Sequence, residues 1–285
     1  MDRRVLKEAL ALSDAHVPYV LATIVDAHGS VPAKKGAAML VREDGRIVGT
    51  IGGAGLEEKV RFLARQALRH HEGGLHRFDL KAWKPGGLQS LCGGSVDVAV
   101  EYVAPKPNVL LWGGGHVALA LSRQLALLDY DHSVADDRGE YVSAERFPNA
   151  RHRWVVAPQE LPSTLEKSGE RFSHAYLLGY DAKKDEEVAF RLLPTFSGAV
   201  GLIASRSKRE ITLKSLRARG LDPETLSRLR SPIGVPMGAE TPEEIAVSIA
   251  GEIIQDLRSS VRKEEVAARA EEAATDHAQE SPGQA

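Results

Sequence analysis

The fold of this chain is decided by residues 109–137, VLLWGGGHVALALSRQLALLDYDHSVADD. An apolar strand runs into three glycines, a helix with apolar periodicity follows, and a second strand ends in two aspartates. Gly113, Gly115 and Ala118 match the pattern G-x-G-x-x-A. In such a turn the first glycine permits the tight bend, the second lets a phosphate approach the backbone, and the small third residue lets helix and strand pack closely. The stretch therefore predicts a Rossmann turn that binds a phosphorylated ligand.

The same stretch indicates how that ligand would be held. A pyrophosphate would lie on the N-terminus of the helix, which begins at His116, because free N–H groups and the helix dipole favour negative charge there. Asp136 follows about 20 residues after the glycines, where an acid can accept hydrogen bonds from a ribose diol. The alternative is a Rossmann fold that keeps its glycines for packing alone.

Strands and helices continue to alternate after this stretch. Apolar strands are predicted near residues 154–157, 174–179 and 199–204, with charged helical segments between them. This alternation favours an α/β fold with a doubly wound parallel sheet covered by helices on both faces. Thr241 and Glu244 form a capping-box pattern that predicts the start of a last helix.

The residues before the glycine turn predict a smaller α+β domain. Strands are expected over 18–26 and 95–103, and an amphipathic helix over 56–70. Between the first strand and the helix, Asp44-Gly45 separates two apolar runs, and this dipeptide supplies the positive φ angles of a tight hairpin.

Two prolines in APKPN, residues 104–108, mark the boundary between the domains, because proline interrupts regular structure. At the other end of the chain the sequence is rich in Ala, Glu, Arg and Gln and offers little apolar surface to bury. We therefore predict an N-terminal domain over 1–104, a Rossmann-like domain over 105–257 and a flexible tail over 258–285.

The composition limits the classes of function. The chain has 285 residues with 43% hydrophobic and 27% charged side chains, enough for two ordinary folded domains. Its net charge of −2 argues against a nucleic-acid partner. The single cysteine fits a reducing compartment, and neither a secretory signal nor an 18-residue apolar run is present, so we expect a cytoplasmic protein without a membrane partner.

Further candidate binding residues lie in glycine-rich loops of the N-terminal domain. Lys34 could pair with an anionic group, and Gly52 and Gly53 permit close approach of a ligand to the backbone. Cys92 and Gly93 lie in LCGGS, where a thiol could ligate a metal or carry sulfur. The alternatives are a solvated turn for the lysine and a buried, inert thiol for the cysteine.

A third group follows a predicted strand in the last third of the chain. Ser205 and Arg206 lie just past its end, on the edge where open α/β sheets bind ligands, and arginine can bind phosphate through two hydrogen bonds. The alternative is a charged helix face.

These motifs together resemble the XdhC/CoxI family from about Leu6 to Leu257. The resemblance is carried by ordered segments along the chain: GSVPAKKGAAMLV, GTIGGAGLEE, CGGSVDVAVEYV, GGGHVALAL, DDRGEYVSAERFPNA, LIASRSKRE and SPIGVPMGAETPEEIAVSIAGEII. Members of this family are accessory factors of molybdenum hydroxylases such as xanthine dehydrogenase. They bind the molybdenum cofactor, protect it, assist its sulfuration and pass it to the apoenzyme.

The resemblance implies a cofactor-binding chaperone rather than a turnover enzyme. Its cofactor would be molybdopterin or molybdopterin cytosine dinucleotide, and its partners a molybdenum hydroxylase apoenzyme, a cysteine desulfurase or a cytidylyltransferase, and a second copy of the chain in a homodimer. In this scheme Cys92 and the turn at Gly113 would face a shared cleft. The alternative function is an NAD(P)-dependent oxidoreductase that uses the same Rossmann turn, although no proton-transfer pair is evident beside it.

The chain also departs from the family pattern. Val31, Ala33 and Lys35 replace residues of a G-S-S-P-R-K-P-G segment, which removes one arginine. The segment GGAGLE at 52–57 lacks a second cysteine often found there, and GYDA at 179–182 lacks both histidines of a T-H-D-H segment. These losses put two-cysteine sulfur chemistry in doubt.

Overall fold

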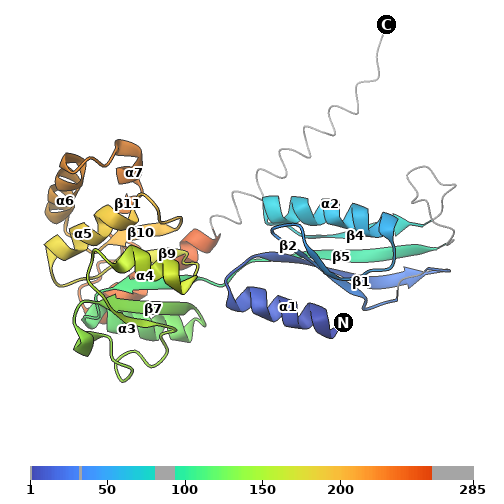
Figure 1. Cartoon of the computed structure of the whole chain (residues 1–285), viewed down its shortest axis with the longest axis horizontal. Helices are drawn as coiled ribbons and strands as arrows, with labels where there is room; N and C mark the ends of the chain where they lie inside the picture. Colours follow the sequence, from blue (N-terminus) through green and yellow to red (C-terminus); the bar gives the residue numbers. More distant parts are fainter. Residues whose placement is uncertain (1, 32–33, 81–93, 259–285) are drawn as a thin grey trace, which may run out of the picture. The chain divides into compact units, whose positions relative to one another are not determined.

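The computed structural model describes residues 2–31, 34–80 and 94–258 (Figure 1). These residues form two compact units, one up to Pro105 and the other over Lys106–Leu257. No helix among the described residues has the length and apolar character that crossing a bilayer requires.

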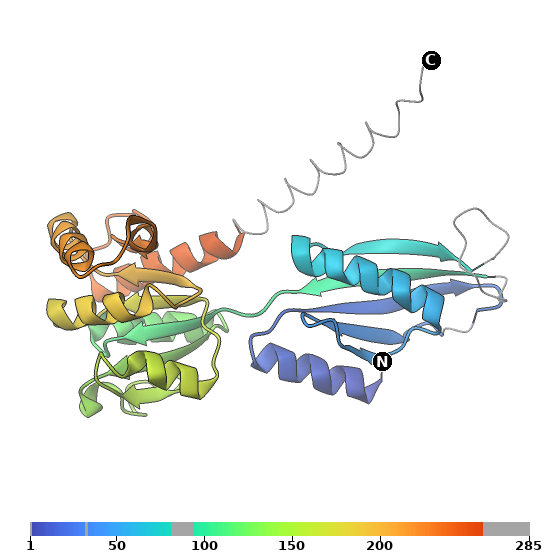
Figure 2. The same ribbon diagram turned by 45° about the horizontal axis from the view of Figure 1, so that its top comes forward.

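The first unit is an antiparallel sheet between two helices. Its strand order is β3-β2-β1-β5-β4. The elements are α1 (Arg3–Asp14), β1 (Tyr19–His28), β2 (Ala38–Arg42), β3 (Ile47–Gly49), α2 (Ala54–His70), β4 (Gly74–Asp79) and β5 (Ser95–Val103). Figure 2 shows α1 and α2 on opposite faces of this sheet.

Alternating side chains explain why both faces of this sheet are covered. Val20, Ala22 and Ile24 of β1 pack with the apolar side of α2, whereas Tyr19 and Leu21 belong to the cluster beneath α1. The hairpin of β2 and β3 is confirmed at Asp44-Gly45, where Gly45 has a φ of +81°. The sheet therefore has two apolar layers.

The second unit contains a six-stranded parallel sheet with the order β11-β10-β9-β6-β7-β8. Its elements are β6 (Asn108–Trp112), α3 (His116–Leu127), β7 (Asp131–Asp136), a 3₁₀ turn η1 (Gly139–Tyr141), β8 (Arg153–Val155), α4 (Leu161–Ser168), β9 (His174–Leu177), α5 (Ala182–Leu192), β10 (Ala199–Leu202), α6 (Arg206–Ala218), α7 (Pro223–Ser227) and β11 (Leu229–Arg230), followed by a helix over 242–258. This is the predicted doubly wound α/β fold.

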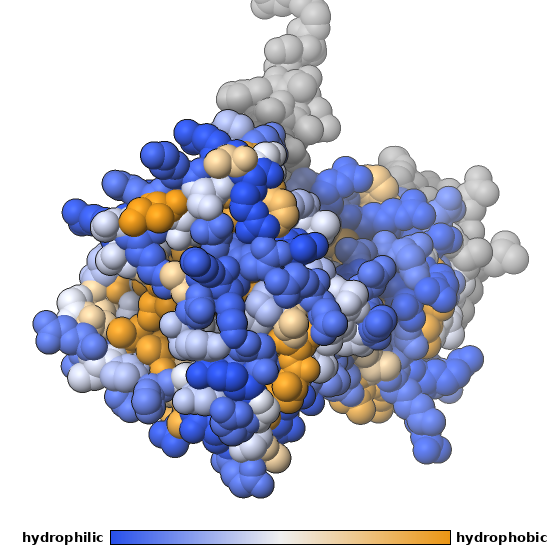
Figure 3. Space-filling view, turned by 60° about the vertical axis from the view of Figure 1, so that its left-hand side comes forward, coloured by the Kyte–Doolittle hydropathy of each residue, from blue (hydrophilic) through white to orange (hydrophobic). Residues whose placement is uncertain are grey.

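Strand β6 lies at the centre of this unit and is buried throughout. Leu110 and Trp112 point into a core formed with α4, α5, α6 and α7, whereas Val109 and Leu111 point into a core formed with α3 and the helix over 242–258. The predicted capping box of that last helix is confirmed, because the Glu244 amide donates to Thr241 Oγ1 at 3.2 Å. Figure 3 shows one face of this unit, with hydrophilic side chains over most of it and apolar ones in separate small patches.

Candidate functional site

The three glycines after β6 have three different environments. Gly113 has a φ of +96°, and a Cβ there would lie 2.7 Å from Gly179 Cα. A Cβ at Gly114 would lie 2.0 Å from the carbonyl oxygen of Tyr141. At Gly115 a Cβ would meet nothing within 4 Å. Gly113 and Gly114 are therefore required by packing, and only Gly115 leaves room for a ligand.

Helix α3 begins with its backbone donors uncapped. Gly115 is the N-cap in an extended conformation, no side chain caps the helix, and its first turn contains no acid. His116 is exposed at this start, whereas Ala118 is fully buried between helix and sheet. Because free N–H groups and the helix dipole favour a negative group, the structure offers an anion-binding position here.

Asp136, at the end of β7, is bonded within its own chain, and its contact with a ribose stays a prediction. Its carboxylate is 1% exposed and accepts hydrogen bonds from Gly114 N at 2.8 Å and from Arg138 N at 3.0 Å. The Arg138 side chain adds two more, from Nε at 2.9 Å and Nη2 at 3.0 Å. Burial acts to raise the pKa of Asp136, but these hydrogen bonds outweigh it and hold the pKa below its ordinary value.

The guanidinium of Arg138 lies between two aromatic rings. Its Cζ is 3.6 Å from the ring centroid of Tyr141 and 3.6 Å from that of Tyr180. Arg146 connects this cluster of side chains to the glycine turn, since its Nη2 donates a hydrogen bond to the Gly114 carbonyl oxygen at 2.9 Å. The sequence analysis missed all of these residues. The only local signal was the position of Arg138, two residues after the acid that ends the strand.

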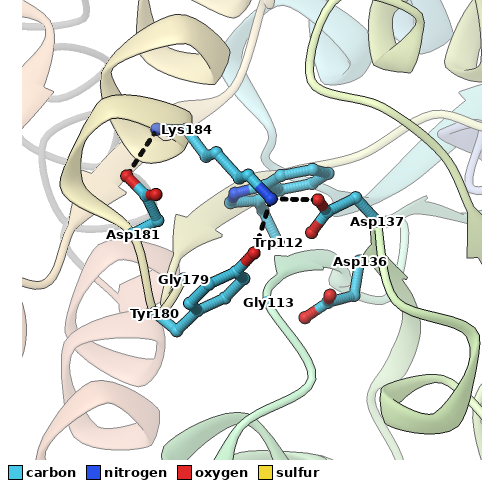
Figure 4. Close-up of a pocket in the computed structure, with 8 residues that line it drawn as sticks. All are labelled: Trp112, Gly113, Asp136, Asp137, Gly179, Tyr180, Asp181 and Lys184. Atoms are coloured by element: carbon cyan, nitrogen blue, oxygen red, sulfur yellow. Dashed lines mark hydrogen bonds and ion pairs between the residues drawn. The ribbon is translucent and has the colours of Figure 1, made fainter.

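A small pocket, too shallow to enclose a water molecule, lies beside this cluster at the carboxyl ends of β6, β7 and β9 (Figure 4). It is lined by Trp112, Gly113, Asp136, Asp137, Gly179, Tyr180, Asp181 and Lys184. The Lys184 ammonium donates to Asp137 and to the Tyr180 hydroxyl, and these bonds raise the pKa of Lys184. The one lysine that lines the pocket is therefore already paired.

A buried acid lies beneath the pocket wall. Asp185 is 1% exposed, and a Cβ at Gly179 would come within 2.0 Å of its Oδ1. Burial raises the pKa of Asp185 to about 6, although Lys208 Nζ, 3.5 Å away, acts in the opposite direction. Glycine is thus required at position 179, because any side chain would displace this carboxylate.

Ser205 and Arg206 have a local role in the structure. Ser205 is the N-cap of α6, and its Oγ accepts a hydrogen bond from Lys208 N at 3.2 Å. Both residues are exposed, and neither lines the pocket beside the glycine turn. Their proposed contact with a phosphate stays a prediction.

Lys34, Gly52 and Gly53 lie in loops at one end of the sheet of the first unit. Lys34 is exposed, in a turn closed by a hydrogen bond from Ala37 N to its carbonyl. Gly52 and Gly53, with φ of +102° and +141°, lead into α2. Cys92 and Gly93 lie outside the described residues, so the role of Cys92 as a metal ligand or sulfur carrier, and a cleft shared with Gly113, stay predictions.

One group of side chains in the described part of the first unit has the composition of a metal site. The ligand atoms of Asp26, His28 and Asp97 lie within 4.8 Å of one another. A bulge in β1, where Ile24 pairs with Val98 and Asp26 with Asp97, turns Asp26 to the face away from α2, where Asp97 already lies by alternation along β5.

Two cations already accompany this group. Lys35 Nζ is 3.9 Å from Asp26, and Arg77 Nε is 3.8 Å from Asp97. Because these cations balance the two carboxylates, we interpret the group as an exposed network of ion pairs and not as a metal site.

Comparison with solved structures gives remote similarity over most of the chain. A xanthine dehydrogenase from Bacillus halodurans aligns with a TM-score of 0.47 and 22% identity, covering 91% of this chain and 96% of that one. The RCK domain of GsuK aligns with a TM-score of 0.32 and 15% identity, covering 90% of this chain and 52% of that one.

Similarity to curated proteins is higher. An uncharacterised protein of Escherichia coli, YqeB, is 35% identical over 88% of this chain and 46% of its own length. A probable xanthine dehydrogenase subunit of Bacillus subtilis is 28% identical over 56% of this chain and 46% of its own length. The chain thus spans about half the length of these relatives.

Two family models match the chain in the order of its units. The XdhC and CoxI family model covers residues 12–79, and the XdhC Rossmann domain model covers residues 109–253, half of the chain. Their order agrees with the antiparallel first unit and the parallel second unit. The chain belongs to the XdhC/CoxI family.

Proposed function

We propose that this protein binds a molybdenum cofactor, as molybdopterin or its cytosine dinucleotide, and serves the maturation of a molybdenum hydroxylase of the xanthine dehydrogenase type. Membership of the family supports this role, as does the Bacillus subtilis relative, whose name describes a probable xanthine dehydrogenase subunit. The observation that carries the proposal is the start of α3, which has no side-chain cap, no acid and open space at Gly115.

The residues at this start fit the phosphate of such a cofactor. The backbone amides from Gly115 onward would donate to its oxygens, and the absence of a Cβ at Gly115 lets the phosphate approach. The bound cofactor would supply the molybdenum centre that the client enzyme uses. The chain itself would bind the phosphate and orient the group until the apoenzyme accepts it.

Further parts of the proposal concern partners. A molybdenum hydroxylase apoenzyme would receive the cofactor, a cysteine desulfurase or a cytidylyltransferase would act before delivery, and two copies of the chain would form the dimer that shields it. The alternative of an NAD(P)-dependent oxidoreductase has less support, because the sequence shows no evident proton-transfer pair beside the glycine turn.

The test is co-expression of the chain with a molybdenum cofactor pathway, followed by mass spectrometry of the purified protein. We expect molybdopterin or its dinucleotide to co-purify with the wild type. Absence of every pterin form, together with tight binding of NAD(H) or NADP(H) in a fluorescence titration, would instead support the oxidoreductase.

A matched pair of variants links the binding to the start of α3. Gly115→Asp and Gly115→Asn both place a favoured N-cap side chain where space is open, so both should fold. Only the aspartate adds a negative charge beside the phosphate. We expect the Asp variant to retain about tenfold less cofactor than the Asn variant, and equal retention would contradict phosphate binding at this helix.

A further inference from the structure

The contacts of Arg138 make up a binding site for a flat cation with paired donors. Two N–H groups of the guanidinium donate to the two oxygens of Asp136, and the rings of Tyr141 and Tyr180 cover its two faces at 3.6 Å. This separation is close to the optimal contact distance of about 3.5–4.0 Å between carbon atoms. The space between the two rings is therefore that of a single planar group.

The Asp136 carboxylate is also fixed without the guanidinium. Backbone amides of Gly114 and Arg138 donate to its two oxygens at 2.8 Å and 3.0 Å. These amides belong to the glycine turn and to the segment after β7. The carboxylate would therefore keep its orientation if the Arg138 side chain moved out, and would then be a buried acceptor without its cation.

A 2-amino-4-oxo-pyrimidine ring, as in a pterin or in guanine, presents the same donors as this guanidinium. Its ring N–H and exocyclic amino group lie side by side on one edge, and both can donate to one carboxylate. Its flat faces can stack on aromatic side chains, as bases do in proteins that bind single-stranded nucleic acids. The Arg138 guanidinium is thus planar like this ring and presents the same pair of N–H donors to the carboxylate.

We infer that Tyr141, Tyr180 and Asp136 form a slot for a planar 2-amino-4-oxo heterocycle, and that Arg138 fills this slot until the heterocycle replaces it. The inference rests on the proposed function, which supplies a pterin as the guest. It assigns Asp136 to the ring edge instead of a ribose, and it makes Arg138 the residue that closes the slot.

The position of the slot agrees with the phosphate site. Gly114 donates to Asp136, and the next residue, Gly115, is the open N-cap of α3. Tyr180 and Asp136 also line the small pocket at the ends of the central strands. A guest with its ring in the slot and its phosphate at α3 would contact both sides of the glycine turn.

The experiment compares two small probes with the full-length chain. 6-Methylpterin carries the 2-amino group, whereas 6-methyllumazine has an oxo group in its place and cannot offer the paired donors. We expect Arg138→Ala to bind 6-methylpterin at least about tenfold more tightly than the wild type, and to prefer it over 6-methyllumazine by a similar factor. Pterin fluorescence and calorimetry would measure both dissociation constants.

Controls separate the slot from general effects. Arg138→Lys keeps a positive charge near Asp136 but cannot fill a planar slot, so it should also bind 6-methylpterin if the alanine variant folds poorly. Arg123→Ala removes an exposed arginine of α3 and should bind as the wild type does. Free guanidinium at millimolar concentration should compete with the pterin in Arg138→Ala.

The outcomes distinguish this inference from the proposed function. Two results would overturn the slot even if whole cofactor co-purifies with the wild type. One is equal affinity of Arg138→Ala for 6-methylpterin and 6-methyllumazine. The other is that folded Arg138→Ala and Arg138→Lys bind 6-methylpterin no more tightly than the wild type does. Tight, selective pterin binding by the variants would support the slot even if no cofactor co-purifies.

Discussion

Helices α2 and α3 begin in similar ways but offer different sites. Each follows a glycine turn with positive φ angles, and neither has a side-chain cap. In α2 an acid stands in the first turn, Glu57, which accepts a hydrogen bond from Thr50. In α3 that turn holds no acid, and the nearest carboxylate, Asp136, is bound to Arg138. A glycine turn can therefore precede a helix whose N-terminal dipole is balanced by an acid of the same chain, as in α2. It can also precede a helix whose N-terminus stays available to an external anion, as in α3.

The largest expected effect tests the packing of the turn before α3. Gly113→Ala would combine a strained φ of +96° with a Cβ 2.7 Å from Gly179 Cα, so we expect a loss of about 4 kcal/mol in the free energy of unfolding. Gly115→Ala, with a φ of −72° and open space, should lose only the better N-cap residue, about 1 kcal/mol. Urea denaturation measures both, and equal losses would show that the two glycines do not differ as described.

The next effect concerns the buried acid beneath Gly179. The pKa of folded Asp185 is about 6, above the 3.8 of an unperturbed aspartate, so the folded state binds a proton more tightly than the unfolded state. The contribution of Asp185 to the free energy of unfolding therefore falls as pH rises between about 4 and 6, by roughly 3 kcal/mol in total. Asp185→Asn should remove this fall. Urea denaturation from pH 4 to 7 compares the two chains, and parallel pH profiles would disprove the shift.

A smaller effect is expected at the turn before α2. Gly53 has a φ of +141°, but a Cβ there would meet nothing within 4 Å. Gly53→Ala should therefore cost only the backbone strain, about 2 kcal/mol, and less than Gly113→Ala. A loss as large as that of Gly113→Ala would mean that the turn before α2 is also closely packed.

The smallest effect tests the acid at the start of α2. Glu57→Gln removes a negative charge that interacts favourably with the helix dipole, at a cost of about 0.5 kcal/mol. Raising the salt concentration should shrink this difference, because salt screens exposed charges. Thermal unfolding at low and high salt measures it, and an equal difference at both would exclude an electrostatic origin.

The sequence predicted the elements with strong local signals. The strand, glycine turn and helix around Gly113 were identified because their periodicity and their small residues occur together. Helix α1 was missed although local signals mark it in the sequence, since Asp2 caps it and Val5 and Leu12 lie on its buried side. Strand β11 has two residues and is defined by its pairing with β10, which local sequence does not show.

The site was predicted only in part, because some of its contacts join segments that are far apart in the sequence. Gly113 and Asp136 could be identified from spacing along one segment. The contact of Arg138 with Tyr180 depends on β7 and β9 ending at the same edge of the sheet, with β6 between them. Spacing also could not show that Asp136 would bind an arginine of its own chain.

The bulge in β1 determines how this strand tolerates changes of length. Val25 is the extra residue, because Ile24 and Asp26 pair with the consecutive residues Val98 and Asp97. Deleting Val25 would leave every later side chain of the strand on its present face. If Val25 instead paired regularly at the same strand length, Asp26 and His28 would turn towards the apolar layer under α2, and the same two polar side chains would become a folding defect.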